Sequence, residues 1–384
     1  MVVTSTISPS VKIGLQLLGV WPGVHSTVYW LIYIPYILIV QYFQYLYVFS
    51  HFNLSELSNL VDSLPPTLNY TLTILKLVSV WIHRRVIHEI VVAVDDDWRE
   101  CIDVDNQLYI MRIKANISHF CSNAMLTFCV FAGILYLLGN YGITLFAEND
   151  NDTLRELPVK IQFPFEADKS PIFELLVVVL SLQLMLNGLI IAILNGFIFS
   201  LVLHVSGQID IICEEFKIIS KKIQLHESFA FKLGMLIERH NKVILFAENI
   251  ENFVSSIALM QVVSNTSVIS CLGFIVVISL SNEDGAFMLL KVISPYIALL
   301  MEIFLFCFAG EYLSHKSKTI ADAAYDSLWY NMPLNRSKII AFIIMRSQTR
   351  LTITAGKIIS LSLESFASIL RASVSYISVF YALS

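Results

Sequence analysis

The sequence predicts an all-α, polytopic membrane protein with seven transmembrane helices. Hydrophobic residues make up 56% of the 384 residues and charged residues only 14%, and the mean hydropathy is +0.71. Soluble domains carry about 25% charged residues, so this composition excludes an ordinary soluble protein. Apolar runs of about 20 residues recur, and a helix of that length spans the ~30 Å hydrocarbon layer.

Each predicted span is an apolar run with polar or turn-forming residues at its ends. The second span is expected to start through Pro65 and Pro66, and the sequence SNEDG at 281–285 predicts a tight turn between the fifth and sixth. Ahead of the first span, 9–20 predicts a short amphipathic lead-in helix, and we expect no cleavable signal. The seven spans are 27–47, 66–82, 120–145, 171–204, 253–280, 286–308 and 355–383.

Positive charges predict which side of the membrane each loop occupies. Most of the 25 Lys and Arg residues fall in one set of segments, whereas the opposite set holds only Arg155, Lys160 and Lys169. Cytoplasmic loops are enriched in positive charge, so we expect the first set, and with it the amino terminus, in the cytoplasm. The glycosylation motifs at Asn53 and Asn151 fall in loops predicted to lie outside. This orientation is the opposite of that in a G-protein-coupled receptor.

The segment between the fourth and fifth spans predicts two further amphipathic helices. Ile212, Phe216 and Ile219 recur at helical spacing, and Leu236 and Val243 belong to a similar stripe. We expect these helices to extend the spans into a cytoplasmic anchor domain. The alternative is a pair of helices lying at the lipid headgroups.

No motif in the sequence indicates an enzyme. A P-loop, an HExxH motif and a GxSxG motif are all missing from the sequence. The nine His residues show no metal-ligand spacing, and the six Cys residues form no CxxC pair. We therefore expect no catalytic residues, no cofactor, no metal and no nucleic-acid partner.

The last predicted span has one polar face and one apolar face. Charged residues are costly in a bilayer and usually face a bundle interior or water. One interpretation is that several copies surround a water-filled channel, and the alternative is that the polar stripe packs against another helix of the same chain. The polar stripe, at steps of three and four residues, comprises Glu364, Ser368, Arg371, Ser375, Ser378 and Ala382. The opposite face comprises Leu363, Phe366, Leu370, Val374, Ile377 and Tyr381.

Three stretches resemble the insect odorant receptor family. The carboxyl-terminal TAGKIISLSLESFASILRASVSYISVFYAL (354–383) looks like the family's terminal signature. ERHNKVILFAENIENF (238–253) and AYDSLWYNM (324–332) resemble its stretches before the fifth and seventh spans. Ser360 departs from the Pro found in many members. The interval between the fourth and fifth spans is only 205–252, whereas the family's co-receptor has a longer insertion there. The chain therefore resembles a tuning receptor rather than the co-receptor.

The resemblance implies an odorant-gated, non-selective cation channel in the plasma membrane of olfactory sensory neurons. Such a tuning subunit joins a co-receptor in a tetramer, in contact with membrane lipid, and its seventh helix lines the pore. By this resemblance Val379 lies at the hydrophobic gate and Ala382 at the filter position. The expected organisation is 1–204 for the lead-in helix and spans one to four, 205–252 for cytoplasmic helices, 253–310 for spans five and six, 311–354 for an anchor segment and 355–384 for the pore helix.

The resemblance also implies a pocket for small lipophilic odorants in the outer half of the bundle. Burial of apolar surface would supply most of the binding. Lys76, which lies in the second span, is expected to extend toward the cytoplasmic edge rather than into the pocket. The predicted pocket residues are Tyr70, Ile74, Ile134, Tyr136, Leu137, Asn140, Gln183, Met185, Asn187, Phe274 and Tyr296.

Other classes of membrane protein remain as alternatives. A metabotropic seven-helix receptor would have its amino terminus outside. A secondary transporter would show internal repeats and broken helices, which we do not find in the sequence. A gustatory-type receptor channel would end in a TYhhhhhQF motif, which is missing here.

Overall fold

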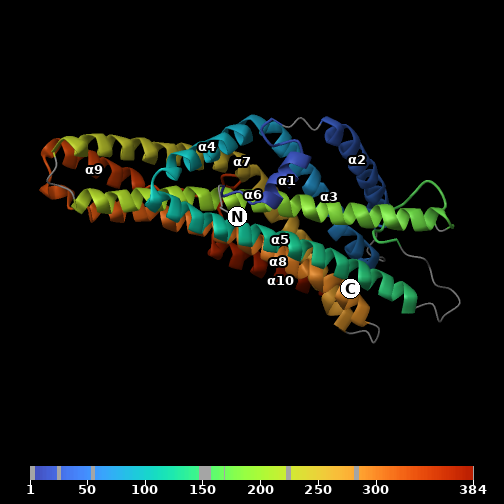
Figure 1. The fold of residues 1–384 in the computed structure, drawn as a ribbon. Coiled ribbons are helices and arrows are strands. Elements are labelled where there is room, and N and C mark those ends of the chain that lie inside the picture. Colours follow the sequence, from blue (N-terminus) through green and yellow to red (C-terminus); the bar gives the residue numbers. More distant parts are fainter. Residues whose placement is uncertain are drawn as a thin grey trace.

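The computed structural model describes residues 5–23, 27–52, 57–146, 157–167, 169–221, 226–280 and 285–383. Long helices run side by side along an elongated molecule (Figure 1). The predicted glycosylation motifs at Asn53 and Asn151, and all of the 281–285 turn except its last residue, lie outside the described residues. The helices are α1 (Pro9–Leu17), α2 (Thr27–Ser50), α3 (Leu57–Ile82), α4 (Arg84–Ile102), α5 (Asp105–Phe146), α6 (Ile172–Lys221), α7 (His226–Leu280), α8 (Gly285–Tyr325), the short 3-10 helix η3 (Trp329–Asn331), α9 (Leu334–Ser347) and α10 (Leu363–Leu383), and the strands are β1 (Thr354–Ala355) and β2 (Ile359–Ser360).

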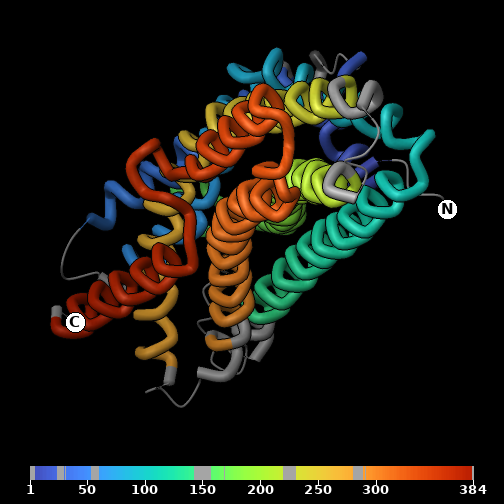
Figure 2. Tube along the Cα trace, turned by 90° about the vertical axis from the view of Figure 1, so that its left-hand side faces the viewer, coloured from blue at the N-terminus to red at the C-terminus, as the bar shows by residue number. Residues whose placement is uncertain are grey.

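Helix α6 is the central element of the bundle. It packs against α5, α7 and α8, and the short α1 also lies on it. Helix α10 lies at the side of the bundle, against α7 and α8 (Figure 2). The 50 residues of α6 are about 75 Å long at 1.5 Å per residue, more than twice the hydrocarbon thickness. The helix therefore extends far beyond the membrane, as the amphipathic stripe after the fourth span predicts.

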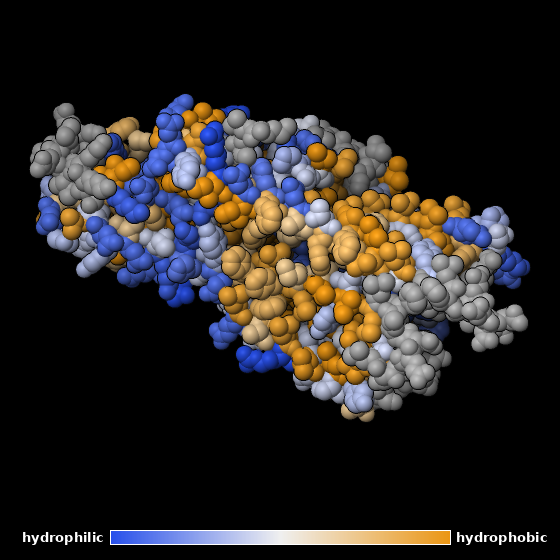
Figure 3. Space-filling model, turned by 60° about the horizontal axis from the view of Figure 1, so that its bottom comes forward, coloured by the Kyte–Doolittle hydropathy of each residue, from blue (hydrophilic) through white to orange (hydrophobic). Residues whose placement is uncertain are grey.

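Five helices in the described part of the chain are long and apolar enough to cross a membrane. Apolar residues gather over the middle and right of Figure 3, and hydrophilic residues gather over the end that carries α9. The other two predicted spans are α3 and α10, whose 26 and 21 residues are also long enough to cross. Their charged and hydroxyl side chains lower their hydropathy. The five apolar spans are Ile32–Ser50, Asp105–Tyr141, Ile172–Ile218, Phe231–Ser279 and Lys291–Asn331.

Two predicted boundaries are wrong. Helix α3 begins at Leu57, so Pro65 and Pro66 lie inside it instead of at its start. Helix α10 begins at Leu363 instead of residue 355, because a two-stranded hairpin occupies 354–360. The hairpin turn contains Gly356 at φ +65° and Lys357 at φ +59°, and left-handed backbone of this kind ends a helix rather than continuing it.

The hairpin is fixed to helix α7. The backbone N–H of Thr354 donates to the Glu251 carboxylate at 2.8 Å, and that of Gly356 donates to the Ser255 carbonyl at 2.9 Å. The Lys357 N–H donates to the Ser255 hydroxyl at 3.0 Å. The hairpin that precedes α10 is therefore attached to α7 by three hydrogen bonds from its backbone N–H groups.

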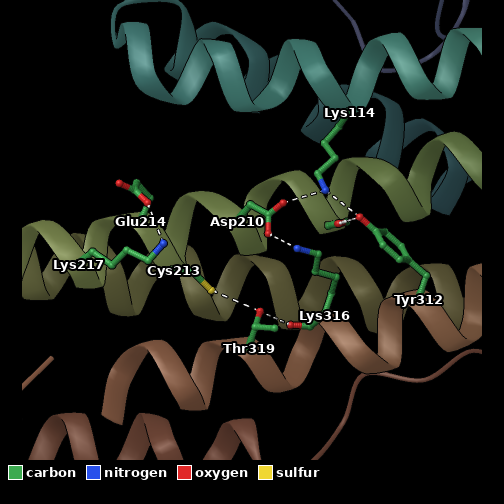
Figure 4. A network of polar contacts seen from close by, with 9 residues as sticks. Lys114, Asp210, Cys213, Glu214, Lys217, Tyr312, Lys316 and Thr319 are labelled. Carbon is green, nitrogen blue, oxygen red and sulfur yellow. Dashed lines mark hydrogen bonds and ion pairs between the residues drawn. The ribbon is translucent and has the colours of Figure 1, made fainter. Parts of the chain in front are cut away.

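A polar network joins α5, α6 and α8 (Figure 4). The Asp210 carboxylate of α6 lies 2.8 Å from the Lys114 ammonium of α5 and 2.7 Å from the Lys316 ammonium of α8. Lys114 also donates to the Tyr312 hydroxyl at 2.8 Å. One acidic group shared by two lysines fixes the lateral spacing of α5, α6 and α8.

Candidate functional site

A cavity of about 200 Å³ lies inside the bundle, between α3, α5, α6, α7 and α8. Every membrane-embedded helix except α2 and α10 contributes to its wall. Apolar side chains of this kind are typical of small-molecule sites, which add only a few polar groups. The apolar wall includes Phe128 and Ala132 of α5, Leu184 and Ile191 of α6, Leu272 of α7 and Leu299 of α8.

Two glycines bring α5 and α6 close together beside the cavity. A Cβ added to Gly133 would lie 2.5 Å from the Met185 sulfur, and one added to Gly188 would lie 2.9 Å from the Cys129 sulfur. Each sulfur therefore occupies the space above the glycine of the facing helix. This packing puts Met185 and Cys129 in the cavity wall.

Two buried polar groups of the cavity wall have an atom without a hydrogen-bond partner among the described residues. These atoms are the hydroxyl oxygen of Tyr70 on α3 and the side-chain carbonyl oxygen of Asn187 on α6. Each residue is only 2% exposed, so bulk water does not reach them. Buried polar atoms are almost always hydrogen-bonded, and a ligand in the cavity could supply the missing partner.

The floor of the cavity is a buried ion pair in a cage of amides. The Glu302 carboxylate of α8 accepts from Lys76 of α3 at 3.2 Å and from Asn195 of α6 at 2.6 Å. Gln261 and Asn265 of α7 donate to the same carboxylate at 2.8 and 3.2 Å. Lys76 also donates to the Asn195 carbonyl at 3.0 Å. This Glu302 cluster (Lys76, Asn195, Gln261, Asn265 and Glu302) connects four helices.

The position of Lys76 corrects the expectation that its side chain extends to the cytoplasmic edge. The side chain is fully buried. A carboxylate within hydrogen-bond distance stabilises an ammonium in the bilayer more directly than a long path to the headgroups. Glu302 was not among the predicted site residues, although a single carboxylate inside an apolar run is itself a signal of function.

A second charged cluster lies beside Tyr136 of the cavity wall. The Lys291 ammonium of α8 lies 3.5 Å from the Asp62 carboxylate of α3 and 5.8 Å from the centre of the Tyr136 ring. Tyr136 donates its hydroxyl hydrogen to the Pro158 carbonyl at 2.9 Å. A Cβ on Gly139 would lie 2.6 Å from the Lys291 backbone nitrogen, so α5 and α8 are in close contact here.

Four of the predicted pocket residues line this cavity. These are Tyr70, Tyr136, Met185 and Asn187.

The other predicted pocket residues lie elsewhere in the bundle. Gln183 is buried and donates to the Tyr33 hydroxyl at 3.3 Å, and Phe274 packs against Phe380 of α10 with ring centres 5.8 Å apart. Ile134 is exposed on the outer surface. The remaining four are Asn140, which is buried, and Ile74, Leu137 and Tyr296, which are half-buried.

The predicted polar stripe of α10 lies on the surface of the protomer. Glu364, Ser368, Arg371, Ser375, Ser378 and Ala382 are all exposed, as is Val379. The alternative in which this stripe packs against another helix of the same chain disagrees with that exposure.

Helix α10 packs on the bundle through only part of its predicted apolar face. Phe366 lies against Phe304 of α8 with ring centres 5.6 Å apart, and Ser373 is buried. Val374 and Tyr381, which belong to the predicted apolar face, are 66% and 62% exposed. The predicted apolar face is therefore rotated relative to the observed one.

Residues 56–374 match the sequence pattern described as the 7tm Odorant receptor family. The chain belongs to the odorant receptor family. Odorant receptor 22c of Drosophila melanogaster is 27% identical over 234 residues, which cover 58% of this chain and 57% of that receptor. The odorant receptor coreceptor of Aedes aegypti is 28% identical over 162 residues, covering 42% of this chain and 33% of the coreceptor. The matched regions thus cover about half the length of the Drosophila melanogaster receptor and about a third of the length of the Aedes aegypti coreceptor.

The fold agrees with that of a solved odorant receptor. The insect olfactory receptor OR5 from Machilis hrabei, solved in complex with eugenol, superposes with a TM-score of 0.80 over 97% of each chain at 13% identity. The identity is low, so this likeness supports the fold alone. Together with family membership it makes this odorant receptor a helical protein of the seven-transmembrane class.

Proposed function

We propose that this chain is the tuning subunit of a heteromeric, odorant-gated, non-selective cation channel. It binds a small lipophilic odorant in the cavity between α3 and α8 and opens a pore lined by α10. The amino terminus lies in the cytoplasm, and the complex resides in the plasma membrane of olfactory sensory neurons. Membership of a receptor family agrees with a binding role, and we propose no enzymatic activity.

The observation that carries this proposal is that α7 and α8 separate the cavity from α10. On α7, Leu272 lines the cavity, while the next residue, Gly273, packs against Ile377 of α10. The contact is so close that a Cβ added to Gly273 would clash with the terminal side-chain carbon of Ile377. On α8, Glu302 lines the cavity while Phe304 contacts α10. A ligand that displaces either helix therefore moves the surface against which α10 packs.

Opening requires that the odorant binds the open arrangement better than the closed one. A ligand shifts a two-state equilibrium only by its differential affinity for the two states. This difference in affinity would act on the surfaces of α7 and α8 that lie between the cavity and α10.

The exposed stripe of α10 supports a pore formed between subunits. One helix cannot enclose a channel, whereas α10 helices from several subunits can present their polar faces to a common axis. We propose a tetramer with the co-receptor, which agrees with the similarity to the Aedes aegypti coreceptor. In that arrangement Val379 contributes to a hydrophobic gate that closes by dewetting, and Ala382 lies at the filter level.

Recording current from cells that express this chain together with the co-receptor tests the proposal. An odorant panel should include eugenol, because the Machilis hrabei receptor was solved with it. Tyr136→Ala and Met185→Ala should change the ranking of odorants, with half-maximal concentrations shifting about tenfold for those that lose buried contact. Leu186→Ala is the matched control, because Leu186 is next to Met185 but exposed outside the cavity.

The pore is tested separately from the pocket. Val379→Ala should raise the resting current, and cysteines placed at Ser375 and Ser378 should react with water-soluble thiol reagents while agonist is applied. Currents that respond to no odorant, or cysteines that stay unreactive in an activated complex, would contradict the proposed channel.

A further inference from the structure

The cavity wall contains a donor and an acceptor that lack partners among the described residues. Tyr70 and Asn187 belong to different helices and line the same cavity, and the unpartnered atoms are the Tyr70 hydroxyl oxygen and the Asn187 carbonyl oxygen. We propose, on the basis of the proposed function, that the preferred ligands are neutral odorants with a hydroxyl group, alcohols or phenols, and that Tyr70 and Asn187 determine this specificity.

The hydrogen-bonding capacities of the two residues define the ligand class. The Tyr70 hydroxyl can donate to a ligand oxygen, whereas the Asn187 carbonyl oxygen can only accept. One hydroxyl group has the capacity both to accept from Tyr70 and to donate to Asn187. An ether, ketone or ester oxygen can accept from Tyr70 but leaves Asn187 without a donor, and a hydrocarbon satisfies neither.

Because Tyr70 and Asn187 are both buried, the difference in hydrogen bonding between these ligand classes affects the binding affinity. Each is 2% exposed, so a ligand that fills the cavity without the correct hydrogen bonds isolates them from water. Leaving a buried polar group unsatisfied costs more than an average hydrogen bond contributes. A hydroxyl group should therefore improve binding about tenfold or more over the matched ether.

The charge balance of the cavity argues against cationic ligands. Lys76 and Glu302 form a neutral pair at the floor, and the carboxylate already accepts from Lys76 and three amides. A ligand ammonium would add a second positive charge with no counter-charge of its own, which is unfavourable in an apolar interior. The donor that the wall requires is therefore neutral.

The cavity is sized for a small molecule with one polar end. Its volume of about 200 Å³ is somewhat larger than that of an apolar cavity of about 150 Å³ that holds benzene in another protein. Tyr70 precedes Lys76 by six residues on α3, or ~9 Å along the helix axis, so the hydroxyl site is separate from the Glu302 cluster. Between these levels the wall is apolar and suits a hydrocarbon body.

Matched ligand sets test the inference. The probes are para-ethylphenol, para-ethylanisole and ethylbenzene, and the alkyl set octanol, octyl methyl ether and octane. Half-maximal concentrations are measured in cells with the co-receptor, and ligand-induced thermal stabilisation is measured on the purified full chain in lipid nanodiscs. The hydroxyl compound of each set should act at concentrations about tenfold lower than its ether and should stabilise the chain more.

The variants Tyr70→Phe and Asn187→Leu should remove this preference selectively. Each should raise the half-maximal concentration of the hydroxyl compound about five- to tenfold while leaving those of the ether and hydrocarbon unchanged or lower. Tyr33→Phe is the matched control, because it removes a partly buried tyrosine hydroxyl that is not part of the cavity wall. It should preserve the hydroxyl preference.

The outcomes separate this inference from the proposed function. If ethers or hydrocarbons act as well as hydroxyl compounds while Met185→Ala still alters odorant ranking, the hydroxyl inference is wrong and the channel proposal stands. If Tyr70→Phe weakens every ligand equally, its role is structural and the inference is also overturned. If no probe or panel odorant produces current or stabilisation, the proposed function itself fails.

Discussion

Replacing Lys76 by Met should destabilise the protein strongly, because it leaves a buried carboxylate without its counter-charge. The Lys76 side chain is fully buried and that of Glu302 is 10% exposed. Removing one partner of a buried ion pair costs about 3–5 kcal/mol. Asn195, Gln261 and Asn265 still donate to the carboxylate in the variant, so we expect the lower end, about 3 kcal/mol.

The double variant Lys76→Met/Glu302→Gln provides the sharper measurement. It removes both charges and keeps their approximate volumes, so it should recover most of the stability lost in either single variant. In thermal melts of the purified protein in detergent, the melting temperature of the double variant should be close to that of the parent. The melting temperatures of both single variants should be well below it.

An exposed ion pair provides the matched control. Lys169 pairs with Glu166 at the surface, where the side chains are 74% and 73% exposed. Such pairs contribute about 0–1 kcal/mol, so Lys169→Met should melt close to the parent. If Lys76→Met melts as Lys169→Met does, or if the double variant is less stable than both single variants, the account of a buried, mutually dependent pair is refuted.

Three further predictions concern other parts of the structure. Gly310→Ala should destabilise the α8–α10 region by about 1–3 kcal/mol, because the added Cβ would lie 2.4 Å from the Leu361 carbonyl oxygen; unchanged melting would contradict this close contact. Asp210→Asn should lower the melting temperature more than Lys114→Met does, because it leaves two lysines without their shared carboxylate; the reverse order would argue against a shared pair. Cys101 lies in α4, outside the five apolar spans, and burial raises the pKa of its thiol to about 11. Mass spectrometry should therefore find Cys101 unalkylated by iodoacetamide at pH 8 in the folded protein and alkylated after denaturation. Rapid alkylation of the folded protein would contradict the burial of this thiol.

The sequence predicted the helices well, because hydropathy and helical periodicity are local properties. It identified all seven spans and the extension of α6 and α7 beyond the membrane. It misplaced the start of α10, since the Gly356 turn depends on contacts with Ser255 and Glu251, about a hundred residues away. Local hydropathy does not reveal such partners.

The cavity was harder to predict because it depends on how each helix is rotated. Successive residues on a helix point about 100° apart, so neighbours in the sequence have different environments. Tyr136 lines the cavity, whereas Leu137 does not. The Glu302 cluster was missed for a related reason, since Lys76 and its carboxylate are 226 residues apart.

The base and the tip of α10 are held in different ways. Its base is bonded to α7 through Thr354 and Gly356, whereas its far end is held mainly by side chains such as Phe380 against Phe274. A helix of 21 residues is about 31 Å long, so a tilt of roughly 10° about this base moves the tip by ~5 Å. In the channel that we propose, a small shift of α7 near the base of α10 would therefore move the tip of α10 several times farther than the base.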